Sequence, residues 1–417
     1  PDGIAAGRTP DRCFPDGGAR FGKPFSQLNG KGQTMTTIDN QNLHAAFSPV
    51  SEPGEGQPEE GIALCLSGGG YRAMVFHLGV LWRLNEFGYL SRLDRVSSVS
   101  GGSITAAMLG LKWGRLAFAG GVAGRLVEEV IDPIRDFAHH TVDVGSVLKG
   151  IFLPGTISDK VASAYRTHLF GDATLQDLPD DPPRFVLNAT NVQSGALWRF
   201  SKPYMRDYLV GEVRQPTVSL AAAVAASSAF PPVLSPAKLV LDPAAFSPAS
   251  GEPYHHPPYT SEVYLSDGGV YDNLGLETAW KRYRKILVSD AGLAMAPDPE
   301  PHTDWAMHAK RVLDLVDNQV RALRKRQLVG GFERGIRQGA YWSVGSDIAA
   351  YGAAGALPCP LPRTTELAQV ATRLADLSDE LQERLINWGY AICDAAMRRW
   401  VDPGLPAPIA FPYPRGV

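Results

Sequence analysis

The stretch Gly68-Gly69-Gly70-Tyr71-Arg72 decides the fold of this chain. It follows the apolar run 62–66 and precedes the amphipathic stretch 74–90, in which apolar residues recur at helical spacing. This pattern predicts a strand, a tight turn and a helix. Because the turn is made of glycines and opens a helix, several backbone N–H groups converge there and favour an anion. We call residues 68–70 the glycine turn.

A second strand, turn and helix is predicted at residues 95–109. Its turn reads Ser98-Val99-Ser100-Gly101-Gly102, and we call these residues the serine turn. Ser100 has a glycine two residues later, so the turn can tighten and expose the hydroxyl as a candidate nucleophile. A serine-rich helix N-cap would give the same residues, and this segment alone leaves both interpretations open.

Composition and charge exclude several classes of protein. The chain has 44% hydrophobic and 20% charged residues, which is typical of a globular protein with a core. Its net charge of −3 argues against nucleic acid as a partner, because phosphate binding needs a basic surface. The four cysteines form no Cys-x-x-Cys pair, which favours the reducing cytoplasm over a disulfide framework or a zinc site. The sequence contains no apolar run of about eighteen residues, so no membrane span is predicted.

Short apolar runs alternate with helical patterns. Buried strands are expected at residues 185–190, 263–266, 285–289 and 340–344, and long helices at 305–328 and 365–399. The alternation predicts an α/β fold whose mainly parallel central sheet is flanked by helices, with sites at the carboxyl ends of the strands. Ser100 and Asp267 would both follow such ends.

Asp267-Gly268-Gly269 closes one of these expected strands and alone would indicate an ordinary turn. Here it follows the glycine turn and the serine turn in order, and with this order residues 62–290 resemble the patatin-like phospholipase family. Residues 226–232, Ala-Ser-Ser-Ala-Phe-Pro-Pro, are similar to another family pattern. Three residues depart from the usual family residues at the two turns, namely Ser67, Ala73 and Ser98.

The resemblance implies a three-layer fold and a Ser-Asp catalytic dyad that needs no histidine, metal or cofactor. Ser100 is then the nucleophile and Asp267 the base, helped by burial that raises the pKa of the carboxyl. The oxyanion donors correspond to Gly68, Gly69 and Gly70. Gly101 opens the helix whose N-terminus favours negative charge on Ser100.

The resemblance further implies hydrolysis of phospholipid carboxylic esters through an acyl-enzyme, with a phospholipid or another acyl ester as the partner. A broader carboxylesterase or an acyl-CoA thioesterase using the same residues is the alternative. Arg72 would orient the glycine turn, contact a substrate phosphate, or lie at the surface. Peripheral membrane contact is an expectation, and the basic run 321–326 is either a solvated helix face or a contact for anionic lipid.

Three parts are predicted along the chain: a largely disordered leader and linker at 1–60, a catalytic core at 61–295, and a mostly helical C-terminal part at 296–417 packed on that core. The Pro-rich insertion at 242–260 is a candidate lid or rim.

The sequence gives less support to three other kinds of site. Gly68-x-Gly70-x-x-Ala73 fits a dinucleotide fingerprint, but its acid, Asp94, precedes a strand instead of following one. A Ser-Asp-His triad with His302 or His308 is compatible in order, although both histidines lie in segments typical of surfaces. The acids at 267, 272 and 290 more often cap turns than bind a metal, and no metal site is predicted.

Overall fold

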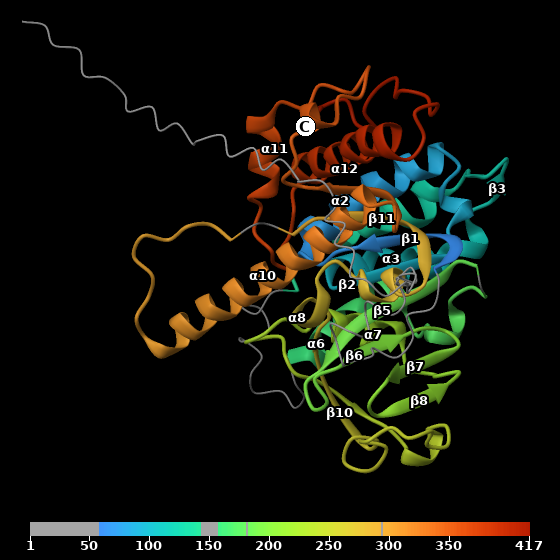
Figure 1. Ribbon diagram of the computed structural model, residues 1–417, viewed down its shortest axis with the longest axis vertical. Coiled ribbons are helices and arrows are strands. Elements are labelled where there is room, and N and C mark those ends of the chain that lie inside the picture. Colours follow the sequence, from blue (N-terminus) through green and yellow to red (C-terminus); the bar gives the residue numbers. More distant parts are fainter. Residues whose placement is uncertain (1–57, 143–156, 181, 293–294) are drawn as a thin grey trace, which may run out of the picture. The chain divides into compact units, whose positions relative to one another are not determined.

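The centre of the fold is a mixed sheet flanked by helices (Figure 1). A computed structural model describes residues 58–142, 157–180, 182–292 and 295–417. Five strands run parallel in the order β12, β11, β1, β2 and β5. Their bounds are Gln338–Ser343, Tyr283–Asp290, Glu59–Leu66, Arg95–Val99 and Arg184–Asn191. The expected central sheet of mainly parallel strands is therefore confirmed.

Most of the expected leader and linker, residues 1–57, lies outside the described residues, and Glu59 and Glu60 already belong to β1. Antiparallel strands extend the sheet beyond β5. β6 (Leu197–Phe200), β7 (Tyr204–Asp207) and β8 (Gly211–Arg214) form a meander, and β10 (Glu262–Asp267) pairs with β5 and β9 (Ala237–Val240). β3 (Phe118–Ala119) and β4 (Val122–Ala123) form a separate hairpin.

The strand that carries Asp267 runs opposite to the expected direction. β10 is antiparallel to β5, so Asp267 does not end a parallel strand. Asn188 of β5 pairs with both β2 and β6, and Ala189 pairs with both β6 and β10. β2 and β10 therefore share one edge of β5 and approach each other head-on, which brings the ends of both strands together.

Helices cover both faces of the sheet because alternate strand residues point to opposite faces. Leu64 and Leu66 of β1 join the larger core with α2 (Gly70–Glu86), α3 (Gly101–Lys112) and α12 (Asp379–Trp400). Ala63 and Cys65 join a second core with α9 (Glu277–Trp280) and α10 (Trp305–Glu333). The remaining α-helices of the described residues are α4 (Asp132–Phe137), α6 (Ile157–Tyr165), α7 (Leu220–Ser227), α8 (Gly269–Asp272) and α11 (Leu361–Ala368).

The C-terminal helix α12 packs directly on α2. A Cβ on Gly79 would lie 1.9 Å from the Ile386 carbonyl oxygen, and a Cβ on Gly389 would lie 2.0 Å from that of Phe76. Only glycine permits such a close crossing. A buried ion pair of 2.7 Å joins Arg83 of α2 to Asp394 of α12, so the two helices are held by both packing and charge.

The prediction of a single helix at 365–399 is wrong, because α11 ends at Ala368 and α12 begins at Asp379. Ser378 caps the new helix by accepting a hydrogen bond from the Leu381 N–H. In the segment between the helices, the Arg373 carbonyl accepts a hydrogen bond of 2.9 Å from the Tyr71 N–H. In a continuous helix, this carbonyl would have accepted a hydrogen bond from within the helix; here it accepts one from α2 instead.

The Pro-rich insertion packs on β8, and none of its residues lines either of the two cavities described below. The Ser247 N–H donates to the Glu212 carbonyl at 2.7 Å, and the His255 ring donates to the Val210 carbonyl at 3.0 Å. This contact explains its position without a lid or rim role. Among the described residues, no helix combines the length and apolarity that crossing a membrane requires.

Candidate active site

Ser100 lies between β2 and α3 on a tight turn with an unusual backbone conformation. Its φ of 52° and ψ of −122° are rare for any residue with a side chain and cost about 1–3 kcal/mol. A Cβ on Gly101 would lie 2.1 Å from the Gly70 carbonyl oxygen, and one on Gly102 would lie 2.5 Å from that of Leu66. The two glycines therefore let the start of α3 lie against the glycine turn.

Ser227, at the end of α7, fixes the serine turn. Its hydroxyl accepts the Ser100 backbone N–H at 3.1 Å and donates to the Asn188 carbonyl at 2.7 Å. The Ser103 hydroxyl lies 2.8 Å from the Ser227 hydroxyl oxygen. Sequence reasoning noted segment 226–232 only for its family pattern and missed this role; the serines in both segments were the available signal.

Asp267 is 2% exposed at the end of β10. Its Oδ1 accepts the Gly269 N–H at 2.7 Å, whereas Oδ2 has no hydrogen-bond partner of ordinary geometry among the described residues. Burial raises the pKa of this carboxyl to about 7, although hydrogen bonding from Gly269 and from the Ser100 hydroxyl opposes the rise. The carboxyl thus interacts with Ser100 and is a far stronger base than an ordinary aspartate.

The glycine turn lies beside Ser100. The Gly68 N–H donates to the Asn273 carbonyl at 3.1 Å, so the structure does not support an oxyanion role for this amide. Gly68 instead makes room, because a Cβ there would lie 2.4 Å from Asn273 Oδ1. The amides of Gly69, Gly70 and Gly101 have no hydrogen-bond partner within the described part of the chain. Sequence reasoning also missed the position of Asn273 between the turns.

His77 and Ser67 support the glycine turn from α2 and β1. His77 Nε2 donates to the Ser67 carbonyl at 3.0 Å, so its Nδ1 accepts from the Ser289 hydroxyl at 2.9 Å. Burial lowers the pKa of His77 to about 4, which keeps the ring neutral. The Ser67 hydroxyl accepts the Ala291 N–H at 2.7 Å, so this departure from the family pattern still ties the turn to the end of β11.

Arg72 is buried and already occupied. Its guanidinium donates four hydrogen bonds to three backbone carbonyls, those of Ala291, Ala368 and Val370. Burial lowers the pKa of Arg72 to about 10. Of the three expected roles, the structure supports orientation of the glycine turn, because Arg72 ties α2 to β11 and to the end of α11.

A cavity of about 630 Å³ opens over these groups, a size typical of small-molecule sites. Ser100, Asp267, Gly69 and Gly70 line it. The apolar part of its lining consists of Val142, Phe230, Pro231, Pro232, Val233, Leu234, Met295 and Leu374. Segment 226–232 therefore contributes both the Ser227 contact to Ser100 and part of a surface suited to a hydrocarbon chain.

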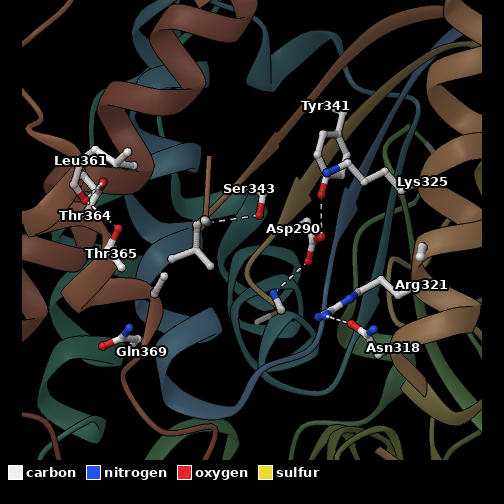
Figure 2. A pocket seen from close by; sticks show the side chains of 15 residues that line it. Asp290, Asn318, Arg321, Lys325, Tyr341, Ser343, Leu361, Thr364, Thr365 and Gln369 are labelled. Atoms are coloured by element: carbon white, nitrogen blue, oxygen red, sulfur yellow. Dashed lines mark hydrogen bonds between the residues drawn. The ribbon is translucent and has the colours of Figure 1, made fainter. Parts of the chain in front are cut away.

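A second cavity of about 380 Å³ adjoins the first and shares Gly292, Asn318 and Arg321 with it. Figure 2 shows the Tyr341 hydroxyl on the Asp290 carboxylate, at 2.7 Å, and Arg321 beside Asn318. The basic run 321–326 does not form one solvated face. Arg321 is buried, the Lys325 ammonium lies over the Tyr341 ring, and Arg324 pairs with Glu277 at 2.9 Å.

The residues of the other chemistries have structural roles or lie at the surface. Asp94 accepts the Ile62 N–H at 2.7 Å and caps the start of β1, at the opposite end from the glycine turn, which argues against dinucleotide binding. His302 is 68% exposed and lies 3.7 Å from Asp304, and His308 is also exposed. Asp272 accepts the amides of two following residues. No cluster of three metal-ligating side chains occurs in the described ranges.

Comparison with known proteins agrees with this geometry. Residues 64–280, more than half of the chain, match the family described as Patatin-like phospholipase. The chain belongs to the patatin-like phospholipase family. No curated protein matches the chain.

Several solved structures are similar to this member of the patatin-like phospholipase family. Human GIVD cytosolic phospholipase A2 has a TM-score of 0.46 and 14% identity, covering 80% of this chain and 60% of that chain. Its complex with methyl gamma-linolenyl fluorophosphonate and terbium chloride has a TM-score of 0.48 and 14% identity, covering 85% and 60%. VipD from Legionella pneumophila has a TM-score of 0.31 and 15% identity, covering 80% and 66%. This chain thus spans about 60% of the length of the first two structures.

Proposed function

We propose that this protein is a phospholipase A or lysophospholipase that cleaves carboxylic ester bonds through a Ser100-Asp267 dyad and an acyl-enzyme. The observation that carries the proposal is the meeting of Ser100 with a buried carboxyl whose pKa is about 7, in a cavity lined by glycine amides that have no partner in the described ranges. A serine hydroxyl needs such a base and such an oxyanion site to act as a nucleophile near neutral pH.

In the proposed mechanism, Asp267 accepts the Ser100 proton as the hydroxyl oxygen attacks the ester carbonyl. The amides of Gly69 and Gly70 donate to the oxyanion, and the N-terminus of α3 at Gly101 favours negative charge at Ser100. The proton then passes to the departing lysolipid or alcohol. Water activated by the same carboxylate hydrolyses the acyl-enzyme and restores Ser100.

The proposal includes peripheral contact with a lipid surface through α10. Trp305 is 86% exposed, and Val312, Val316 and Leu323 are each about half exposed. At 100° per residue these four side chains form one apolar stripe, opposite the face that lines the catalytic cavity. Figure 1 shows the N-terminal end of α10 extending away from the sheet. The helix carries six Lys or Arg and three acidic residues, but most of these cations are engaged within the protein, so the apolar stripe carries the proposed contact.

Two experiments test these proposals. A panel of phospholipids, monoacylglycerols, p-nitrophenyl esters and acyl-CoA separates a phospholipase from a carboxylesterase or thioesterase, and we expect phospholipids to give the highest kcat/KM.

Trp305→Glu should reduce sedimentation with anionic vesicles without changing hydrolysis of a water-soluble ester. Val240→Glu, on exposed β9, is the matched control. Absence of vesicle binding by the wild type would contradict the lipid contact, as would a dimer that buries the stripe.

A cytoplasmic location also stays a proposal from the cysteine pattern. Cys65, Cys359 and Cys393 are buried free thiols, which suits a reducing compartment.

A further inference from the structure

Five cationic residues line the catalytic cavity: Arg72, Lys310, Arg311, Arg321 and Arg373. The side chains of the first four are engaged with other described residues. Arg72 holds three carbonyls, as described above. Lys310 pairs with Asp314 at 2.6 Å, Arg311 donates to the Ala296 carbonyl at 2.9 Å, and Arg321 lies beside Asn318 (Figure 2). For the Arg373 guanidinium, the described part of the chain provides no hydrogen bond, ion pair or ring contact.

The backbone of Arg373 is fixed against the glycine turn. Its carbonyl accepts the Tyr71 N–H at 2.9 Å, and a Cβ on Gly70 would lie 2.6 Å from the same oxygen. The next residue, Leu374, accepts the Val142 N–H at 2.8 Å. An exposed cation that has no partner among the described residues is thus anchored immediately beside the candidate oxyanion donors.

This cation is suited to a phosphodiester. In a glycerophospholipid the phosphate lies only a few bonds from the scissile ester, so an ester at Ser100 places the phosphate near the rim of the cavity. A guanidinium binds phosphate oxygens with paired, charge-assisted hydrogen bonds. Arg72, the other candidate for a phosphate contact, has its donors on backbone carbonyls.

We propose that Arg373 binds the phosphate of a phospholipid substrate and sets the preference of the enzyme for phospholipids over uncharged acyl esters. The inference rests on the proposed hydrolase function of the same cavity. It assigns headgroup recognition to the segment between α11 and α12, which lies outside residues 64–280 that match the family.

Two measurements on Arg373→Ala, Arg373→Lys and the wild type test this assignment. The first is kcat and KM on a short-chain phosphatidylcholine and on a diacylglycerol with the same acyl chains, both in one neutral detergent. Arg373→Ala should raise KM for the phospholipid about tenfold or more and change the diacylglycerol constants less than about twofold, because only the phospholipid loses a charge-assisted contact. Arg373→Lys should restore part of the loss. Arg363→Ala, an exposed arginine of α11, is the control.

The second measurement is calorimetric binding of ether-linked analogues of both lipids, which cannot be hydrolysed. We expect Arg373→Ala to weaken binding of the ether phospholipid alone. Equal weakening of both analogues, or no change in either, would overturn the inference, as would a wild type that binds the two equally. A wild type that binds the ether phospholipid through Arg373 but hydrolyses no ester would contradict only the proposed function.

Discussion

Ser100 and Asp267 meet because two strands approach each other along one edge of β5. Val99, just before Ser100, pairs with Asn188, and Asp267 pairs with the adjacent residue Ala189. Two side chains far apart in the sequence are therefore placed by sheet register and not by a flexible loop. Such placement on strands gives the precision that the proposed catalytic pair requires.

The strain at Ser100 predicts an effect on stability that is separate from chemistry. Ser100→Gly should be more stable than Ser100→Ala by about 1 kcal/mol, because glycine tolerates a φ of 52° and alanine does not. Urea unfolding of both variants measures the difference. Ala117 has the same φ in an exposed turn, so Ala117→Gly should also be stabilising. An alanine variant at least as stable as the glycine variant would contradict strain at this turn.

The raised pKa of Asp267 predicts pH-dependent stability. The folded carboxyl keeps its proton up to about pH 7, whereas the unfolded carboxyl loses it near pH 4. The folded state thus binds more protons between these values, and this contribution to stability falls as the pH rises through the window. Asp267→Asn does not titrate and should be more stable than the wild type by about 2–4 kcal/mol at pH 8, with little difference at pH 4. Equal stability at pH 8 would contradict the shift.

The same pKa predicts the pH dependence of activity. Asp267 must be ionised to accept the Ser100 proton, so kcat/KM should fall as the pH drops below about 7. Initial rates on an uncharged ester between pH 5 and 9 measure this profile, since such a substrate does not titrate itself. A rate that stays constant down to about pH 5 would show that the base is not this carboxyl.

Ser227→Ala should lower both stability and turnover. It leaves the Ser100 N–H and the Asn188 carbonyl without their partner, which costs about 1–3 kcal/mol of unfolding free energy. We expect kcat to fall about tenfold or more as the serine turn loosens. Ser91→Ala, at an exposed serine, is the control. Normal kcat in Ser227→Ala would remove the role of this hydroxyl.

Arg72→Lys should destabilise the protein by about 2–4 kcal/mol, because an ammonium cannot reach three carbonyls in the geometry of a guanidinium. Thermal unfolding with parallel kinetics measures the effect. An increase in KM for phospholipid with unchanged stability would instead favour a substrate contact for Arg72.

The sequence predicted the parts of the fold that depend on local pattern. The strand, turn and helix at 62–90 and again at 95–109 follow from apolar periodicity and glycine placement. The direction of β10 did not follow, because it depends on pairing with β5 and β9, which are far away in the sequence. The break between α11 and α12 was missed for a similar reason, since the Tyr71 N–H binds the intervening backbone from α2.

The candidate site was predictable to the extent that its residues occur in ordered motifs. Ser100 and Asp267 were named from such motifs, and the structure brings them together. Three features could not be predicted, because each depends on distant parts of the chain: the engaged Gly68 amide, the Ser227 contact, and an Arg373 guanidinium without a partner in the part of the chain that the structure describes.

The most direct test of the dyad is intact mass measurement after exposure to an alkyl fluorophosphonate, with the modified residue located by peptide mapping. We predict one adduct, on Ser100, in step with loss of ester hydrolysis, no adduct in Ser100→Ala, and much slower labelling in Asp267→Asn. An adduct on another residue that abolishes activity, or a Ser100→Ala variant that hydrolyses lipid esters at the wild-type rate, would contradict the account.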